Sequence, residues 1–420
     1  MDIKKPTVNN KPTVNNKPTV NKKPTINKKP TVNKKPTAKK KKTPMQKVLI
    51  ALIVVLFLIL VAIAVMYIFP ASEDFTALGP FGGWLIPGRG TTQGPSPEQT
   101  PESTQTPEPV LDSFSPLTGL PMEKAKTRNR PLAVVINNIP ESLPMNGVSE
   151  ADIIYEVLVE GGITRMLALY QDVSRVEKVG SIRSARHYTV EIANSYDAIL
   201  ASAGASPQAL SMVKQLGIPH LNEVEGPLRE IFFRDRNRVP GRRLESLHSV
   251  VLTGERAAEW LPKYDFRILL EEDREQVLTF VEDGTPRGGS AAVEISVRFN
   301  SGNTTNFTYK PEDKVYNMRE FNRDFIDAND NSSPAFTNIL ILKTSVSPIR
   351  GDGAGRLNIE TTGTGDGYFI CGGKYIEIDW ARADRDSPFM YSLKDGSSLR
   401  FGVGRTYICV IPNKMDVTFS

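Results

Sequence analysis

The longest hydrophobic segment of the chain runs from Val48 to Phe69, where 22 consecutive residues are apolar or aromatic. As a helix it covers roughly 33 Å, enough to cross a hydrocarbon core of about 30 Å. A cleaved signal peptide has a shorter apolar region and a small-x-small cleavage site, of which Phe69-Pro70-Ala71 is a poor version. The pattern therefore predicts an uncleaved signal anchor, with a single transmembrane helix over residues 48–69 in the lipid bilayer.

Before this helix, residues 1–47 repeat the unit Lys-Pro-Thr-Val/Ile-Asn-Asn/Lys, with a proline every six residues from Pro6 to Pro36. The segment has 15 Lys, one acid and almost nothing to bury, so it is predicted to be a disordered tail. Because the lysines flank this side of the span, we expect a cytoplasmic N-terminus and an extracytoplasmic C-terminal region. The tail is expected to attract anionic lipids; nucleic acid or a cytoplasmic protein is the alternative partner.

Residues 70–115 are rich in Pro, Gly, Ser and Thr, which predicts an extended linker. Its few large apolar residues, Phe81, Trp84, Leu85 and Ile86, are expected at the membrane interface. The linker would hold the folded region away from the bilayer.

From residue 116 to 285, short apolar runs alternate with helical patterns, which predicts an α/β N-terminal domain. Ligands are expected in the loops at the strand ends of such a domain. Strands are expected at 131–138, 153–159, 166–170 and 197–203, with 160–165 as a hairpin turn. Helices are expected at 184–195 with Ser184 as its cap, at 207–216 between Ser206 and Gly217, and at 253–261.

Residues 286–420 show strand patterns without helices, which predicts a β-rich C-terminal domain. Gly372-Gly373 and Lys394-Asp395-Gly396 are typical of hairpin turns. The expected strands are 291–299, 306–309, 314–318, 339–344, 368–371, 375–380 and 405–411.

Both cysteines of the chain, Cys371 and Cys409, lie in this C-terminal region. A disulfide between them would close a loop of about 38 residues and stabilise the fold by about 3–4 kcal/mol. Two buried thiols fit their apolar neighbours equally well, so both states stay open.

Net charge separates the tail from the rest of the chain. The whole chain carries +5, yet the first 47 residues alone hold 15 Lys and one acid. The folded region is therefore acidic overall, which argues against nucleic acid as its ligand.

The loop Gly180-Ser181-Ile182-Arg183-Ser184-Ala185-Arg186-His187 is the main candidate for a binding site. If Ser184 caps the following helix, free backbone N–H groups and the guanidinium groups of Arg183 and Arg186 would face one spot, with Ser181 beside them. That combination suits a carboxylate or a phosphate. The alternative is that the arginines pair with acids of the same domain, such as Glu156, Glu160 or Asp197.

Glu156 and Glu160 lie four residues apart on a predicted strand and therefore share a face. With Arg165 they could line the anion pocket or act as a general acid and base; pairing with the arginines is the other interpretation. No His, Cys or acidic cluster has metal-ligand spacing, so neither a metal nor a cofactor is expected. Ser202 is expected to be a small residue at a tight turn and not a nucleophile.

Several contiguous motifs resemble the YerB-like family of bacterial, membrane-attached extracytoplasmic proteins. They are 130–138, Gly147 to Glu156, 160–165, 180–186, 196–210 and 404–412. The resemblance covers residues 112–420 and implies an α/β N-terminal part with a β-rich C-terminal part. Family members begin with a lipidated cysteine, whereas this chain has an apolar span. Where the family tends to read Ala-Pro-His-Asn, this chain has Ser246-Leu247-His248-Ser249, so only His248 is shared.

Three functions follow as hypotheses. The first is a membrane-anchored binding module for an anionic cell-envelope ligand or a wall-synthesis partner. The second is an enzyme acting on envelope glycopolymers, by loose similarity to wall-polymer ligases of the LytR-CpsA-Psr type, which clamp a pyrophosphate lipid with arginines. The third is a passive structural scaffold, which predicts no defined pocket.

Overall fold

The strands that the apolar runs predict lie in the interior of the protein. In the computed structural model, which describes residues 110–226, 229–272, 274 and 276–420, every residue of β3 (Leu132–Asn138), β4 (Ile153–Leu158) and β5 (Thr164–Tyr170) is buried. A strand that is apolar on both sides needs a covering layer on each face. β4 and β5 form the expected antiparallel hairpin, and β5 pairs antiparallel with β3.

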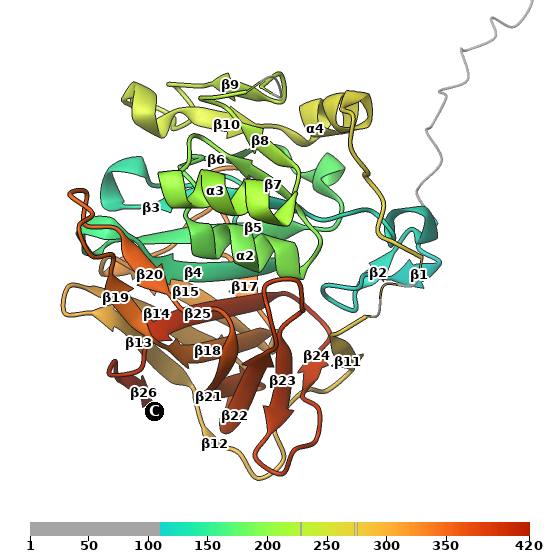
Figure 1. Ribbon diagram of the computed structural model, residues 1–420. Coiled ribbons are helices and arrows are strands. Elements are labelled where there is room, and N and C mark those ends of the chain that lie inside the picture. The colour runs from blue at the N-terminus through green and yellow to red at the C-terminus, as the bar shows by residue number, and fades with distance from the viewer. Residues whose placement is uncertain (1–109, 227–228, 273, 275) are drawn as a thin grey trace, which may run out of the picture. The chain divides into compact units, whose positions relative to one another are not determined.

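These strands belong to a large mixed sheet that joins both predicted domains (Figure 1). The junction is β25 (Thr406–Pro412), which runs parallel to β4 on one side and to β18 (Asn338–Thr344) on the other. Within the described residues the sheet has eleven strands. Beyond the strands already named, they are β12 (Ser290–Ala291), β22 (Lys374–Arg382), β21 (Gly363–Cys371), β23 (Met390–Leu393), β7 (Ile199–Ser202) and β8 (His220–Asn222).

A second, smaller sheet comes from the C-terminal region. In the described part of the chain it has six strands: β16 (Arg323–Asp324), β15 (Val315–Glu320), β14 (Asn303–Lys310), β13 (Glu294–Asn300), β26 (Val417–Phe419) and β17 (Ala335–Phe336). The smaller pairings are β1 (Ser113–Phe114) with β2 (Pro121–Met122), β6 (Val179–Gly180) and β9 (Phe232–Arg234) with β10 (Val250–Leu252), β11 (Thr279–Val281) with β24 (Arg400–Gly402), and β19 (Val346–Pro348) with β20 (Leu357–Ile359).

Alternation along β4 shows how the layers stack. Tyr155 points to one face of the large sheet, where its hydroxyl lies 2.8 Å from that of Tyr196 at the end of α2 (His187–Ser195). Glu156 points to the opposite face, where it accepts a hydrogen bond of 2.8 Å from Thr305 of the small sheet. Successive side chains of a strand face opposite ways. The helical layer and the small sheet therefore cover opposite faces of the large sheet.

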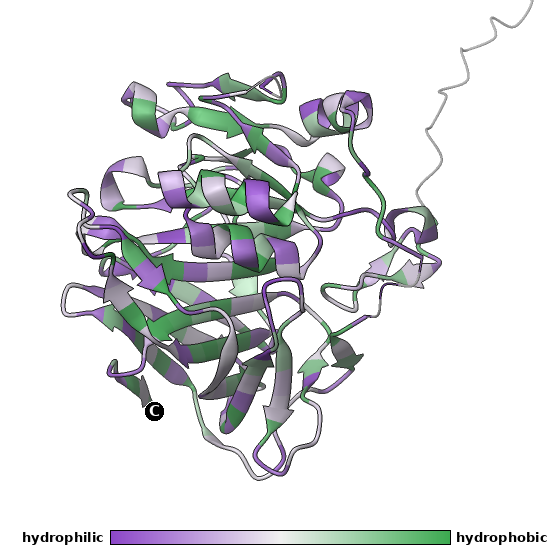
Figure 2. Ribbon diagram, in the orientation of Figure 1, coloured by the Kyte–Doolittle hydropathy of each residue, from purple (hydrophilic) through white to green (hydrophobic). Residues whose placement is uncertain are grey.

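Two of the helices follow the sequence prediction closely. α3 (Pro207–Leu216) begins after Ser206, whose hydroxyl accepts from the Ala209 N–H, and ends at Gly217 with φ of +66°. α4 (Gly254–Trp260) is capped by Thr253. α2 and α3 lie side by side (Figure 1). α3 buries Ala209 and Met212, leaves Leu210 exposed, and has both polar and apolar residues along its length (Figure 2). The 3-10 turns are Lys124–Lys126, Pro140–Ser142, Glu160–Gly162, Val173–Arg175, Ser246–His248 and Leu261–Lys263.

The expected start of α2 is wrong. The helix begins at His187, three residues later than predicted, and the Thr189 hydroxyl accepts at 2.9 Å from the N–H of Arg186, the residue before the helix. Ser184 instead donates its hydroxyl to the Ala203 carbonyl at 2.9 Å. The prediction rested on a serine that precedes an apolar run. Because Ser184 bonds to the Ala203 carbonyl, its hydroxyl does not cap the helix.

The fold is β-rich with few helices, so an alternating α/β pattern describes only part of the N-terminal region. That part is the parallel set β3, β7 and β8 with α2 and α3, whereas β4 and β5 are antiparallel. No helix among the described residues is long and apolar enough to cross a membrane. The predicted span at 48–69, the tail at 1–47 and nearly all of the linker lie outside those residues.

The predicted glycine turn and the two cysteines both lie in the described C-terminal region. Gly372 and Gly373 form the two-residue turn between β21 and β22, with φ of +57° and +75°, which suits a type I′ hairpin. Cys371 and Cys409 are both buried and free, on β21 and β25 with β18 between them. The two-thiol alternative is the one observed.

Candidate functional site

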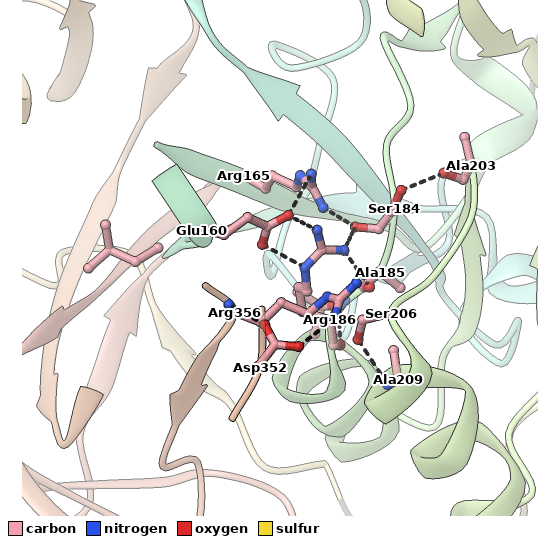
Figure 3. A network of polar contacts seen from close by, with 12 residues as sticks. Glu160, Arg165, Ser184, Ala185, Arg186, Ala203, Ser206, Ala209, Asp352 and Arg356 are labelled. Atoms are coloured by element: carbon pink, nitrogen blue, oxygen red, sulfur yellow. Dashed lines mark hydrogen bonds and ion pairs between the residues drawn. The ribbon is translucent and has the colours of Figure 1, made fainter. Parts of the chain in front are cut away.

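Glu160 gathers two of the predicted site arginines into a closed network (Figure 3). Arg186 binds its carboxylate with two N–H groups, one of them from Nε to Oε2 at 2.9 Å. Arg165 approaches the same carboxylate, with Nη2 3.8 Å from Oε1, and also donates to the Ser184 carbonyl. Both guanidinium groups are buried: the arginines are 4% and 6% exposed. This network engages all three guanidinium nitrogens of Arg186, whereas Nε of Arg165 is buried without a partner among the described residues.

Charge pairing dominates the electrostatics of this network. Burial alone would raise the pKa of Glu160, but the hydrogen bonds and charge of Arg186 outweigh it and lower the pKa to about 2. Burial, then the charge of Arg186, lowers the pKa of Arg165 to about 9. Glu160 is therefore ionised at neutral pH and compensates one of the two adjacent positive charges.

Arg183, by contrast, lines an open pocket of about 570 Å³. The pocket lies at the carboxyl ends of β7 and β8: Ala203 directly follows β7, and Glu223 and Val224 follow β8. In sheets with parallel strands, loops at that edge form the usual ligand sites. The other lining residues are Arg234, Arg236, Glu245, Ser246, Leu247 and Val250.

The three arginines of the pocket differ in their partners. Arg234 is held by Glu223 through two N–H···O bonds of 3.0 and 2.9 Å. Arg183 donates Nη1 to the Leu247 carbonyl at 3.0 Å, and Arg236 donates Nε to the Leu244 carbonyl at 2.9 Å. Across the described ranges, neither Arg183 nor Arg236 has a carboxylate within 4.0 Å.

Arg183 also keeps unused hydrogen-bonding capacity. Its Nε is buried and has no partner within the described part of the chain. Burial, then the charge of Arg186, lowers the pKa of Arg183, which nevertheless starts from a value so high that the group stays cationic at neutral pH. A guanidinium group that lines a pocket with no carboxylate within 4.0 Å among the described residues favours an anion from outside.

The remaining predicted residues lie elsewhere. Ser181 is fully buried. Glu156 is fully buried beneath the opposite face of the sheet, so it does not share a site with Glu160. Ser202 has its hydroxyl 2.7 Å from His220 Nε2, yet it is fully buried and holds a strand end together.

Sequence reasoning did not find Arg234 and Arg236. They follow the apolar pair Phe232-Phe233 in an Arg-x-Arg pattern, the only local signal for them. Their approach to Arg183 depends on β9 pairing with β10, which also pairs with β6 just before Arg183. Among the residues that the structure describes, no group of three or more His, Cys, Asp or Glu side chains is placed to hold a metal ion.

Comparisons with known proteins agree with the motifs. Two family profiles match the chain: the N-terminal domain of DUF3048, described as a protein of unknown function, over residues 117–258, and the C-terminal domain of the same family over residues 295–408. The chain is 31% identical over 303 residues to the predicted lipoprotein YerB of Bacillus subtilis (strain 168), a match that covers 71% of this chain and 86% of YerB.

The fold is similar to a solved structure as well. The crystal structure of the YerB protein from Bacillus subtilis superimposes with a TM-score of 0.61 at 28% identity, and the match covers 73% of this chain and 99% of that one. The similarity to YerB-like proteins predicted from the motifs is thus confirmed, and the chain belongs to the DUF3048 family, with both of its domains present.

Proposed function

We propose that this protein is a membrane-anchored, extracytoplasmic module that binds an anionic ligand of the cell envelope in the pocket of Arg183. Three features support the location: the apolar run at 48–69, the lysines on its N-terminal side, and the similarity to a predicted lipoprotein. The N-terminal tail would stay at the cytoplasmic face, where its lysines meet anionic lipids.

One observation carries the binding role: the cations of Arg183 and Arg236 line a pocket at the carboxyl ends of two parallel strands and have no acid partner among the described residues. A bound anion would gain favourable electrostatic energy from two cations that line the same pocket. Phosphate or carboxylate groups fit the planar fork of arginine. Glu223 and Glu245 at the same pocket would disfavour an anion that fills it entirely.

The test is a calorimetric titration of the full chain in detergent micelles with inorganic pyrophosphate. Replacing Arg183 and Arg236 together by Ala should weaken binding by about 30-fold or more. Arg243→Ala is the matched control, since Arg243 is exposed on the same segment and does not line the pocket. Equal binding by the double variant and the wild type would remove these arginines from the proposal. Product formation with added magnesium would favour the glycopolymer-modifying enzyme instead.

A further inference from the structure

Two glutamates meet in the interior between the large and the small sheet. Glu156 lies on β4 and is 0% exposed; Glu320 lies on β15 and is 1% exposed. One comes from the region that matches the N-terminal family domain and the other from the region that matches the C-terminal domain. The pair therefore lies where the two family domains are packed together.

Neutral groups make all the hydrogen bonds to the Glu156 carboxylate. Thr164 donates to Oε1 at 2.7 Å, and Thr305 and Tyr407 donate to Oε2 at 2.8 and 2.9 Å. Asn138 adds a longer bond of 3.2 Å to Oε1. Four neutral donors can satisfy one carboxylate.

These four donors do not suffice for a second carboxylate, that of Glu320. Glu320 shares Asn138, whose Nδ2 lies 2.7 Å from Oε1, and Thr305, which is 3.4 Å away. Its other oxygen, Oε2, is buried without a partner in the described ranges, and so is Oδ1 of Asn138. The cluster thus has more buried acceptors than donors, and a proton on Glu320 would supply a donor.

Among the residues that the structure describes, only neutral groups donate hydrogen bonds to the pair. The polar groups facing the pair are Asn138 on β3, Thr164 on β5, Asn303 and Thr305 on β14, and Tyr407 with Cys409 on β25. Neither glutamate forms an ion pair within the part of the chain that the structure describes. Burial raises the pKa of Tyr407 and of Cys409 well above their ordinary values, so both are neutral at physiological pH. Two adjacent carboxylates would therefore carry their full charge in a low-dielectric interior.

We infer that Glu156 and Glu320 hold one shared proton, and that this proton is a pH-sensitive lock between the small sheet and the large sheet. The contacts of 2.7–2.9 Å come from neutral Asn, Thr and Tyr donors and add no positive charge to the pair. Loss of the proton would leave two like charges face to face and loosen the contact between the sheets.

The direction of the pH effect follows from burial. Desolvation, then the charge of Glu156, raises the pKa of Glu320 well above its ordinary 4.5, and desolvation also raises the pKa of Glu156. The folded state therefore binds the proton more tightly than the unfolded state does. This stability is complete below about pH 4.5 and is lost as the pH rises through the raised pKa.

Glu320→Gln tests the lock, because glutamine keeps the shape and supplies the donor permanently. Urea unfolding of the full chain in detergent is measured at several pH values from about 6.5 to 8.5, above the range in which Asp152, with a pKa raised to about 6, contributes. The wild-type unfolding constant should rise with pH, by up to about tenfold per pH unit for one proton, and more steeply than that of the variant. The control is Glu294→Gln on the same sheet, where the carboxylate is exposed. Parallel curves for wild type and Glu320→Gln would overturn the inference.

Infrared spectroscopy gives a readout that does not depend on refolding. The wild type at neutral pH should show the C=O stretch of a protonated carboxyl, and Glu320→Gln or Glu156→Gln should lose it. Absence of the band from the wild type would refute a shared proton. Stabilisation by added calcium that Glu320→Gln abolishes would replace the proton by a metal ion and would equally refute it. Neither result bears on the pocket of Arg183, which lies at the carboxyl ends of β7 and β8.

Discussion

Two pairs of arginines, both close to the same loop, have opposite surroundings. Arg165 and Arg186 are buried around Glu160, whose carboxylate offsets one of their two charges. Arg183 and Arg236 line a pocket and donate only to backbone carbonyls among the contacts that the structure describes. An arginine-rich motif therefore does not by itself indicate a binding site. The position of the nearest carboxylate decides whether each guanidinium group stabilises the fold or remains available for a ligand.

The difference has a simple energetic origin. A buried guanidinium group loses its hydration and is tolerated only if a charge and several hydrogen bonds replace the water. Arg186 receives both from Glu160 and two backbone carbonyls. Arg236 keeps its hydration because it is exposed, so it needs no internal acid. A ligand that displaces this water must therefore supply its own negative charge.

The largest expected effect on stability comes from breaking the ion pair between Arg186 and Glu160. Arg186→Ala removes the partner of Glu160 and should lower the free energy of unfolding by about 2–3 kcal/mol, somewhat below the cost for a fully buried pair because the Glu160 side chain is 27% exposed. Urea unfolding monitored by circular dichroism measures it. Arg243→Ala, at an exposed position, should change stability by less than about 0.5 kcal/mol. Equal effects of the two substitutions would contradict the assignment of Arg186 to the fold.

The same pair also sets the behaviour in acid. Because the pKa of Glu160 is lowered to about 2 in the folded state, its contribution is present above the ordinary value of 4.5 and is lost as the pH falls toward 2. Glu160→Gln should therefore weaken the pH dependence of unfolding in that range. A variant that loses stability as steeply as the wild type on acidification would argue against this ion pair.

Substitution of the two pocket arginines, Arg183 and Arg236, should weaken ligand binding and leave the stability of the fold nearly unchanged. Replacing Arg183 and Arg236 together removes two charge-assisted hydrogen bonds to the anion, so the affinity for inorganic pyrophosphate should fall by about 30-fold or more. The melting temperature should stay close to that of the wild type. Loss of folding in the double variant, with binding retained in Arg186→Ala, would reverse the comparison.

The two serines offer a smaller test of the local structure. Ser206→Ala removes the cap of α3 and should cost about 1 kcal/mol. Ser184→Ala, at the position that does not cap α2, should cost less than half as much. Thermal unfolding of both variants measures the difference. A larger cost at Ser184 would show that the α2 start had been misplaced.

A further modest effect is expected at the acid that restrains the third pocket arginine. Glu223→Gln releases Arg234 from its ion pair and should tighten pyrophosphate binding by about 3- to 10-fold. The gain should shrink as salt is added, because exposed charges are screened. Weaker binding after this substitution would indicate that Glu223 itself contacts the ligand.

How far the sequence predicts the molecule depends on the range of each signal. Local signals succeeded: Ser206 with Gly217 bounds α3, and the apolar runs locate β3 and β4. Pairings between distant segments could not be predicted, because nothing in one sequence shows that β25 lies beside β4. The large mixed sheet follows from that pairing.

The candidate site shows the same limit. The loop around Arg183 was identifiable from its composition, but its acid partners were not. Glu156 and Glu160 look equivalent along the chain. Glu156 lies on the strand and points into the interior, whereas Glu160 lies in the hairpin turn and contacts Arg186. Arg236 is more than fifty residues away from Arg183 in sequence, and the pairing of β9 with β10 brings it to the pocket.

Arginine-specific modification of the full chain with a phenylglyoxal reagent, followed by mass spectrometry, tests the difference between the two pairs most directly. Arg183 and Arg236 should react in the free protein and become protected by inorganic pyrophosphate, while Arg165 and Arg186 should stay unmodified in both conditions. Protection of Arg165 or Arg186 by the anion, or unchanged reactivity of Arg183 and Arg236, would contradict the account.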